Sequence, residues 1–131
     1  MNVRILVVDD NARFLESART LLEREGMTVV GVASDAESAL RDVQLLRPDV
    51  ALVDVDLGGQ SGLELARQIV ERRGRASTQV ILVSAYREED LADLVADSPA
   101  VGFVSKAHLS SRAIVELLDG SPGQPTGGPP G

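Results

Sequence analysis

Short apolar segments alternate with amphipathic segments along this chain of 131 residues. Five apolar segments have the length and the β-branched composition of strands, at positions 3–8, 28–33, 50–53, 79–83 and 101–104. Because these segments are apolar almost throughout, and not only at every second residue, we expect a parallel sheet that is buried on both faces.

The segments between the predicted strands carry apolar residues at helical spacing. The five stripes consist of Phe14, Ala18, Leu21 and Leu22; of Ala36, Ala39, Leu40, Val43 and Leu46; of Gly62, Ala66, Ile69 and Val70; of Leu91, Leu94 and Val95, the weakest; and of Ala113, Ile114, Leu117 and Leu118. Strands that alternate with helices predict the α/β class, with a doubly wound five-stranded parallel sheet and helices on both of its faces.

Several helix ends carry local signals. Ser34-x-x-Glu37 and Ser61-x-x-Glu64 have the pattern of a capping box, which predicts that helices begin there. Gly26 and Gly120 stand where two helices should end.

We expect one folded domain at residues 1–120. Residues 121–131 contain no large apolar side chain, so we expect a disordered Gly/Pro-rich tail, or a linker to an output domain beyond Gly131.

Composition excludes several classes of protein. No apolar run approaches the roughly 18 residues that span a bilayer, and the first residues do not form a signal peptide. The chain has no cysteine, so it has no disulfide and no thiolate metal site. Its net charge of −7 makes direct binding to nucleic acid unfavourable. We therefore expect a cytoplasmic domain that binds neither membrane nor nucleic acid.

Polar residues follow four of the five predicted strands. The first strand ends in Asp9-Asp10, the third in Asp54, the fourth in Ser84 and the fifth in Ser105-Lys106. In a doubly wound sheet, ligands bind beyond the carboxyl ends of the strands, at the point where the strand order reverses. If the order is 2-1-3-4-5, that point lies between the first and third strands and brings the three aspartates together. The alternative is that Asp9 and Asp10 cap the first helix and that Asp54 begins a turn.

Three neighbouring carboxylates repel one another unless a cation lies among them, and Mg²⁺ suits such a group because it prefers oxygen ligands and leaves room for phosphate. An aspartate can attack phosphorus and form an aspartyl phosphate. Lys106 is the one lysine among thirteen basic residues. Its compact ammonium could neutralise a phosphoryl group, although the arginine bias of the whole chain could also leave one lysine by chance.

These residues stand in segments whose order and spacing resemble the receiver domain of bacterial two-component response regulators, over positions 3–118. The segments are Ile5-Leu6-Val7-Val8-Asp9-Asp10, Pro48-Asp49-Val50-Ala51-Leu52-Val53-Asp54-Val55-Asp56-Leu57, Gly62, Ile81-Leu82-Val83-Ser84-Ala85 and Gly102-Phe103-Val104-Ser105-Lys106. The resemblance implies a flavodoxin-like fold and a phosphorylation-dependent signalling switch, not an enzyme.

The resemblance also implies roles for single residues. Asp54 would accept a phosphoryl group from a partner histidine kinase. The Mg²⁺ ligands would be Asp9, Asp10, Asp54 and the backbone carbonyl of Asp56.

Around the phosphoryl group, the resemblance implies that Lys106 pairs with it and that Ser84 donates a hydrogen bond to it. Phe103 would be the switch aromatic and Tyr86 a possible gate. The fourth helix, fifth strand and fifth helix, residues 87–118, would form the face that changes. That face would act on an output domain or a separate target protein, or form a phosphorylation-linked homodimer.

Three departures from the family pattern bear on the site. In the turn after Asp54, Gly58 stands where the family usually has proline, and Gly59 follows it, which predicts a looser loop. Ala107 follows Lys106 where a cis proline is common, so the geometry of that peptide bond is open. Asp56 adds an acid beside the site, which could strengthen metal binding, repel phosphodonors or point to solvent.

Two other classes of function remain open at this point. A degenerate receiver would act as an interaction module without phosphorylation. Asp54-Val55-Asp56-Leu57 also resembles the nucleophile motif of haloacid-dehalogenase-like phosphatases. In that family the motif normally follows the first strand and the acidic pair comes last, whereas here the pair comes first. His108, the single histidine, is interpreted as a helix-cap or surface residue.

Overall fold

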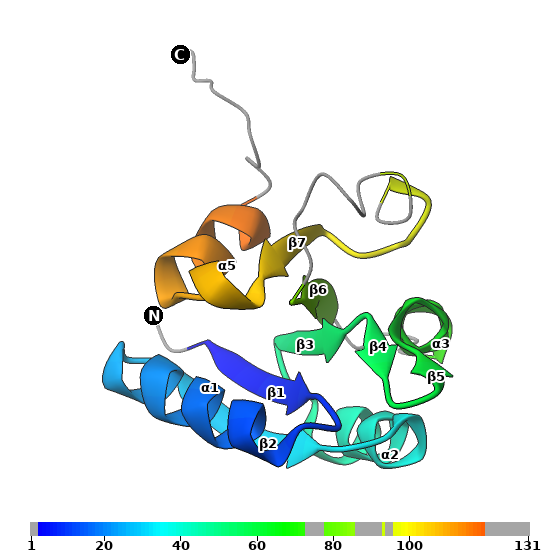
Figure 1. Ribbon diagram of the computed structural model, residues 1–131, viewed down its shortest axis with the longest axis horizontal. Coiled ribbons are helices and arrows are strands. Elements are labelled where there is room, and N and C mark those ends of the chain that lie inside the picture. The colour runs from blue at the N-terminus through cyan, green and yellow to red at the C-terminus, as the bar shows by residue number, and fades with distance from the viewer. Residues whose placement is uncertain (1–2, 73–77, 86–92, 94–95, 120–131) are drawn as a thin grey trace.

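A computed structural model of the chain describes residues 3–72, 78–85, 93 and 96–119 (Figure 1). Its centre is a parallel sheet with the strand order β2-β1-β3-β6-β7. The strands are β1 (Arg4–Val8), β2 (Thr28–Ala33), β3 (Val50–Asp54), β6 (Gln79–Ser84) and β7 (Gly102–Ser105). All five predicted strands are therefore confirmed, and the order is the predicted 2-1-3-4-5.

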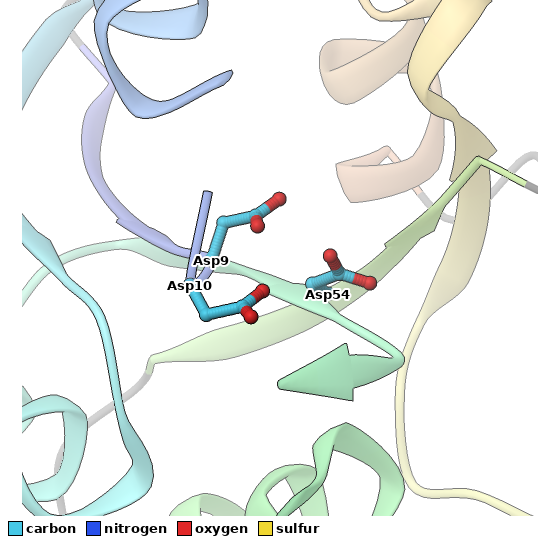
Figure 2. A group of neighbouring side chains, drawn as sticks. All are labelled: Asp9, Asp10 and Asp54. Atoms are coloured by element: carbon cyan, nitrogen blue, oxygen red, sulfur yellow. The ribbon is translucent and has the colours of Figure 1, made fainter. Parts of the chain in front are cut away.

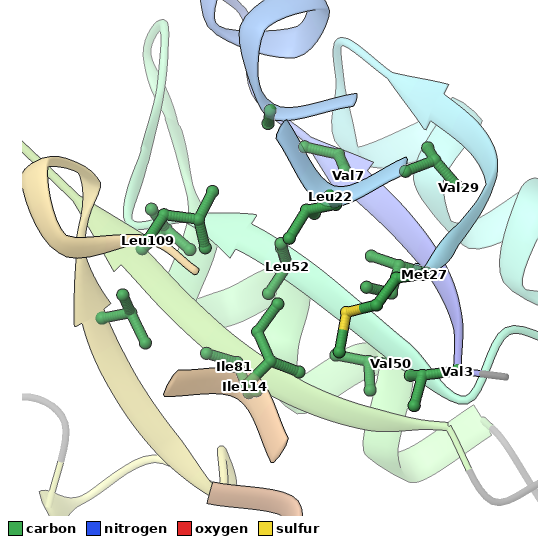
Figure 3. Close-up of a cluster of buried hydrophobic side chains, with 14 residues drawn as sticks. Val3, Val7, Leu22, Met27, Val29, Val50, Leu52, Ile81, Leu109 and Ile114 are labelled. Atoms are coloured by element: carbon green, nitrogen blue, oxygen red, sulfur yellow. The ribbon is translucent and has the colours of Figure 1, made fainter. Parts of the chain in front are cut away.

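Helices cover both faces of the sheet, as predicted. On one face, α1 (Ala12–Arg24) and α5 (Ser111–Leu118) contribute Leu22 and Ile114 to a buried cluster with Leu52 and Ile81 from the strands (Figure 3). On the other face, α2 (Ala36–Leu46) and α3 (Gly62–Arg72) pack against the opposite side chains of the same strands. The predicted stripe of Leu91, Leu94 and Val95 lies outside the described residues.

Helix α1 ends as predicted. Gly26 has φ +96, a value that glycine adopts without strain. The Gly26 N–H donates to the carbonyl of Glu23, and the Met27 N–H donates to the carbonyl of Leu22. These two bonds form the Schellman arrangement and satisfy carbonyl groups that the end of the helix would leave without partners. Gly120, the other predicted helix stop, lies outside the described residues.

The two predicted capping boxes have different outcomes. Ser61 Oγ accepts a hydrogen bond from the Glu64 N–H, so the predicted start of α3 is confirmed. The prediction of Ser34 as the cap of α2 is wrong, because the cap is the next residue, Asp35, whose carboxylate accepts from the Ser38 N–H at 2.8 Å. Adjacent Ser and Asp residues are both good caps, and the extended backbone of Asp35 decides between them.

A two-stranded hairpin that was not predicted follows β3. Strand β4 (Asp56–Leu57) pairs antiparallel with β5 (Gln60–Ser61), and Gly58 and Gly59 form the turn with φ +59 and +100. The expectation of a loose loop is therefore wrong. Positive φ at both turn residues is what a two-residue hairpin with a type I′ turn requires, and a proline, held near φ −65°, could not adopt the backbone of Gly58.

Within the described residues, no helix combines the length and the apolar character that crossing a membrane requires.

Candidate functional site

The predicted site residues come together at the carboxyl edge of the sheet. Asp9 directly follows β1, and Asp54 is the last residue of β3, the strand beside it. Ser84 ends β6 on the other side of β3, and Lys106 directly follows β7. These residues line a pocket of about 280 Å³, together with Asp10, Asn11, Asp56 and Ala85. The parallel strand order therefore produces the site.

Three carboxylates form the acidic part of this pocket. Asp9, Asp10 and Asp54 each offer one oxygen, and these oxygens lie within 4.8 Å of one another (Figure 2). Asp9 and Asp54 are buried, with 1% and 7% of their surface exposed, whereas Asp10 is exposed. Burial raises the pKa of Asp54 above its ordinary value, and Asp9 adds to the rise, although the Asp56 N–H and Lys106 act in the opposite direction. The site thus favours a partner with positive charge.

Lys106 supplies part of that charge. Its Nζ lies 2.7 Å from Asp9 Oδ2 and 3.0 Å from Asp54 Oδ2. Burial alone would lower the pKa of Lys106, but the hydrogen bonds and charges of the two aspartates outweigh it and raise the pKa. The same nitrogen lies 4.4 Å from the centroid of the Phe14 ring, which supports it from the start of α1. Lys106 is therefore held, as an ammonium, between two acids and a ring.

Backbone groups hold the remaining oxygens of two acids. Asp9 Oδ1 accepts a hydrogen bond from the Asn11 N–H at 2.9 Å, and Asp54 Oδ1 accepts one from the Asp56 N–H at 3.0 Å. The cap of α1 is Asn11, whose side chain accepts from the N–H groups of Arg13 and Phe14. The alternative role of Asp9 and Asp10 as caps of this helix is therefore wrong, because the first residue after them already fills it.

The donor set fits a divalent cation with oxygen ligands. Three carboxylates converge at the ends of β1 and β3. Within the described residues, the fully buried Asp9 Oδ2 has its ion pair with the Lys106 ammonium and no further hydrogen-bond donor. One lysine leaves this cluster negatively charged. Mg²⁺ is a hard cation that combines one or two carboxylates with water and phosphate oxygens, and this acidic, open-sided pocket offers such ligands.

The other predicted residues lie at different depths. Ser84 is buried, with 2% of its surface exposed, and lines the pocket. Phe103 is also buried, but it packs in the cluster on the α2 and α3 face. Asp56 is exposed. Tyr86 lies outside the described residues, so its role as a gate stays a prediction.

The segment after β7 contains the peptide bond between Lys106 and Ala107, whose geometry the sequence left open. Among the described residues no peptide bond is cis, so the bond between Lys106 and Ala107 is trans. Lys106, Ala107 and His108 form a short 3₁₀ helix, η1 (Lys106–His108), and Ser105 Oγ accepts a hydrogen bond from the Ala107 N–H. His108 is exposed, in agreement with its interpretation as a surface residue.

Sequence reasoning missed three residues of the site. In the sequence, Phe14 belongs only to the apolar stripe of the first helix, Asn11 has no predicted role, and Gly58 predicts a looser loop. Asn11 carried a usable signal, because asparagine directly before an apolar helical stripe is a common cap. The contacts of Phe14 and Gly58 join segments far apart in the chain, and no local pattern indicates them.

Comparison with known proteins gives a consistent result. A family model, the response regulator receiver domain, matches residues 5–119. A protein-glutamate methylesterase/protein-glutamine glutaminase 2 from Burkholderia thailandensis is 35% identical over 134 residues, which cover 91% of this chain and 36% of that protein. The DNA-binding transcriptional activator EvgA of Escherichia coli K12 is 30% identical over 112 residues, 86% of this chain and 54% of that protein. The chain thus spans only part of the length of these relatives.

Solved structures agree with the sequence matches. The signal receiver domain of the putative response regulator NarL from Mycobacterium tuberculosis superposes with a TM-score of 0.76 at 31% identity, over 94% of this chain and 98% of that one. The response regulator domain of Thermotoga maritima CheB gives a TM-score of 0.70 at 30% identity, over 91% and 90% of the two chains. These matches give no support to the phosphatase alternative.

Proposed function

The chain belongs to the response regulator receiver domain family, and from that premise we propose that Asp54 is the residue that accepts the phosphoryl group. The observation that carries this assignment is the place of Asp54 in the sheet. It ends β3, between the strand that leads to Asp9 and Asp10 and the strand that ends in Ser84. A phosphoryl group on Asp54 would therefore have the carboxylates that hold the cation on one side and the hydroxyl of Ser84, a hydrogen-bond donor, on the other.

The donor would be the phosphorylated histidine of a partner kinase. A carboxylate oxygen of Asp54 attacks phosphorus, the new O–P bond forms as the N–P bond breaks, and the imidazole nitrogen keeps the electron pair. Phosphoryl transfer mainly demands positioning and neutralisation of charge, so the protein needs no further covalent chemistry. Bound Mg²⁺, held by Asp9, Asp10, Asp54 and the backbone carbonyl of Asp56, would supply positive charge beside the phosphoryl oxygens.

Lys106 supplies the second positive charge. Its ammonium already lies 3.0 Å from Asp54 Oδ2, so it can move to a phosphoryl oxygen over a short distance. Ser84 is buried in the same pocket and would donate a hydrogen bond to the phosphoryl group. When Ser84 moves toward the phosphoryl group, it would leave space beside β7, and the ring of Phe103 would turn inward into that space. Phe103 is therefore the proposed switch residue.

The proposed output of the switch is the face formed by the fourth helix, β7 and α5. Because the relatives are longer than this chain, we propose that the receiver acts either on an output domain that follows the Gly/Pro-rich segment 121–131 or on a separate target protein. A homodimer that forms through this face on phosphorylation is the third form of output. In each case the chain acts as a signalling domain, and any enzymatic activity would belong to another domain.

Intact-mass spectrometry with Mg²⁺ and acetyl phosphate tests the acceptor. We expect the wild type to gain the mass of one phosphoryl group and Asp54→Asn to gain none. Asp119→Asn is the matched control, because it removes an exposed aspartate that lies outside the pocket and should still be modified. An equal gain in wild type and Asp54→Asn would refute the assignment, and no gain in the wild type would favour an interaction module that is not phosphorylated.

A further inference from the structure

The three aspartates of the pocket are held in different ways. Asp9 and Asp54 each accept a backbone hydrogen bond and pair with Lys106. No described residue donates a hydrogen bond to the carboxylate of Asp10 or forms an ion pair with it, yet this carboxylate lies within 4.8 Å of the other two. Asp10 directly follows Asp9 in the chain, so the position of its carboxylate depends on its side-chain conformation and on the space around it.

The Asp10 carboxylate lies beside Gly58, in the turn between β4 and β5. A Cβ atom built on Gly58 would lie 2.6 Å from Asp10 Oδ2 and 3.3 Å from Asp10 Cγ. The carboxylate of Asp10 thus occupies the space that any larger residue at position 58 would fill. Gly59, the other residue of the turn, has open space where its Cβ would be.

The segment that carries Gly58, here called the 56–61 hairpin, is attached to the fold at three points. Leu57 is buried among the side chains on the α2 and α3 face. Gln60 Oε1 accepts a hydrogen bond from the Ala36 N–H at 3.0 Å, at the start of α2. Ser61 caps α3, as described above. A hairpin anchored in this way can act as a rigid support for the side chain that rests on it.

We propose that the 56–61 hairpin is a positioning device for the cation site, in which Gly58, because it has no side chain, leaves the space in which the Asp10 carboxylate lies beside Asp9 and Asp54. Gly58 has no side chain that could be a ligand and acts through Asp10. This inference rests on the proposed role of Asp10 as a cation ligand. It gives Gly58, which stands where the family commonly has proline, a function in metal binding.

The test is the Mg²⁺ dissociation constant of the full chain, measured by calorimetry without a phosphodonor. Contacts that orient metal ligands typically change affinity by 10–100-fold, so Gly58→Ala should weaken Mg²⁺ binding by about tenfold. Gly59→Ala is the matched control. It places the same methyl group in the same turn, at a positive φ that is less favourable for alanine, and should leave the constant close to that of the wild type.

Two further measurements separate the possible results. Melting temperatures in EDTA show whether a variant damages the fold in the absence of the cation. A positioning role requires that Gly58→Ala loses more Mg²⁺ affinity than Gly59→Ala, even if the two variants melt at similar temperatures. Asp10→Asn establishes whether Asp10 is a ligand. If Asp10→Asn binds Mg²⁺ as the wild type does, the proposed cation site and this inference both fail. If Asp10→Asn binds weakly but Gly58→Ala matches Gly59→Ala, only this inference fails.

The attachment of the hairpin gives an independent pair of variants, which also decides the question if Gly58→Ala does not fold. Gln60→Met keeps the size of the side chain and removes the oxygen that accepts from Ala36, so it should weaken Mg²⁺ binding. Gln60→Glu keeps an acceptor oxygen and should bind Mg²⁺ at least as tightly as the wild type. Unchanged affinity in Gln60→Met would overturn the role of the hairpin as a support.

Discussion

Lys106 places its ammonium 4.4 Å from the centre of the Phe14 ring while the same nitrogen contacts Asp9 at 2.7 Å. The ring comes from the first turn of α1 and the lysine from the segment after β7, so two segments that are far apart in the chain meet at this point. An aromatic face attracts a cation by about 0.5–1 kcal/mol at exposed sites and by more where water is excluded. Phe14 therefore helps to fix the one ammonium of the pocket.

Phe14→Leu should weaken the fold, because leucine keeps apolar bulk but has no aromatic face. We expect the free energy of unfolding to fall by at least about 0.5–1 kcal/mol from the lost cation–π contact alone. Urea denaturation followed by circular dichroism measures it. The loss should be smaller in a Lys106→Met background, where the cation is absent, and Phe14→Tyr should retain most of the stability. Equal losses with and without Lys106 would show that Phe14 acts only as a packing residue.

Lys106→Arg should lose the switch, although it keeps a positive charge at this position. The ammonium fits between two carboxylates at 2.7 and 3.0 Å, above a ring, and the planar, forked guanidinium is larger. We expect the variant to fold but to lose the conformational response to beryllofluoride. Amide hydrogen exchange of β7 and α5 measures that response. An arginine variant that responds as the wild type does would mean that this position needs only positive charge.

Gly62→Ala should be among the most damaging substitutions in the chain. Its Cβ would lie 1.8 Å from the backbone oxygen of Asp54 and 2.8 Å from Val55 Cα. Backbone atoms cannot rotate away as a side chain can, so α3 or the end of β3 must shift. Overpacking costs about 1–3 kcal/mol and occasionally more, and we expect the upper part of that range or beyond in urea denaturation. A loss no larger than that of Gly59→Ala, which meets no atom within 4 Å, would contradict this view.

The corrected start of α2 predicts different effects for two adjacent substitutions. Asp35→Ala removes the carboxylate that accepts from the Ser38 N–H, and should lower the melting temperature. Ser34→Ala removes a hydroxyl that makes no capping bond in α2, and should change the melting temperature little. Thermal unfolding of the two variants under the same conditions is the measurement. The opposite ranking would restore Ser34 as the cap.

Glu25 predicts a dependence of stability on pH. Its carboxylate accepts a hydrogen bond from the Ser111 N–H at 2.6 Å, which joins the end of α1 to the start of α5, and this bond lowers the pKa of Glu25. A lowered pKa in the folded state means that the stabilisation is present above the unfolded-state pKa and is lost as the pH falls through the folded-state pKa.

Glu25→Gln should therefore be less stable than the wild type at neutral pH, and the difference should shrink in acid. Urea denaturation of both proteins from pH 7 down into the acidic range measures the difference. A difference that stays constant across this range would show that the charge of Glu25 contributes nothing to the contact with Ser111.

The main features of the site were predictable because each main residue directly borders a strand. Asp9, Asp54, Ser84 and Lys106 each end or directly follow a strand that its length and its apolar, β-branched composition indicate, and parallel strands bring their carboxyl ends to one edge. Once the strand order is known, the neighbourhood of Asp9 and Asp54 follows from it.

What could not be predicted depends on contacts between loops. The pairing of Gln60 with the start of α2 joins residues 24 positions apart, and the ring under Lys106 comes from the opposite end of the chain. Local periodicity carries no information on such contacts. Gly58 and Gly59 were misread for another reason: glycine permits both a loose loop and a tight turn, and the pairing of β4 with β5 decides between the two.

The order of the strands also has a consequence for synthesis on the ribosome. The four strands β2, β1, β3 and β6 are complete once residue 84 has emerged, and with them Asp9, Asp10 and Asp54. Lys106 and the edge strand β7 that precedes it are made later, at about 5–20 residues per second. For that interval the nascent chain carries its three aspartates without the lysine that pairs with two of them. Docking of the last strand therefore brings both the final backbone pairing of the sheet and the counter-charge of Asp9 and Asp54.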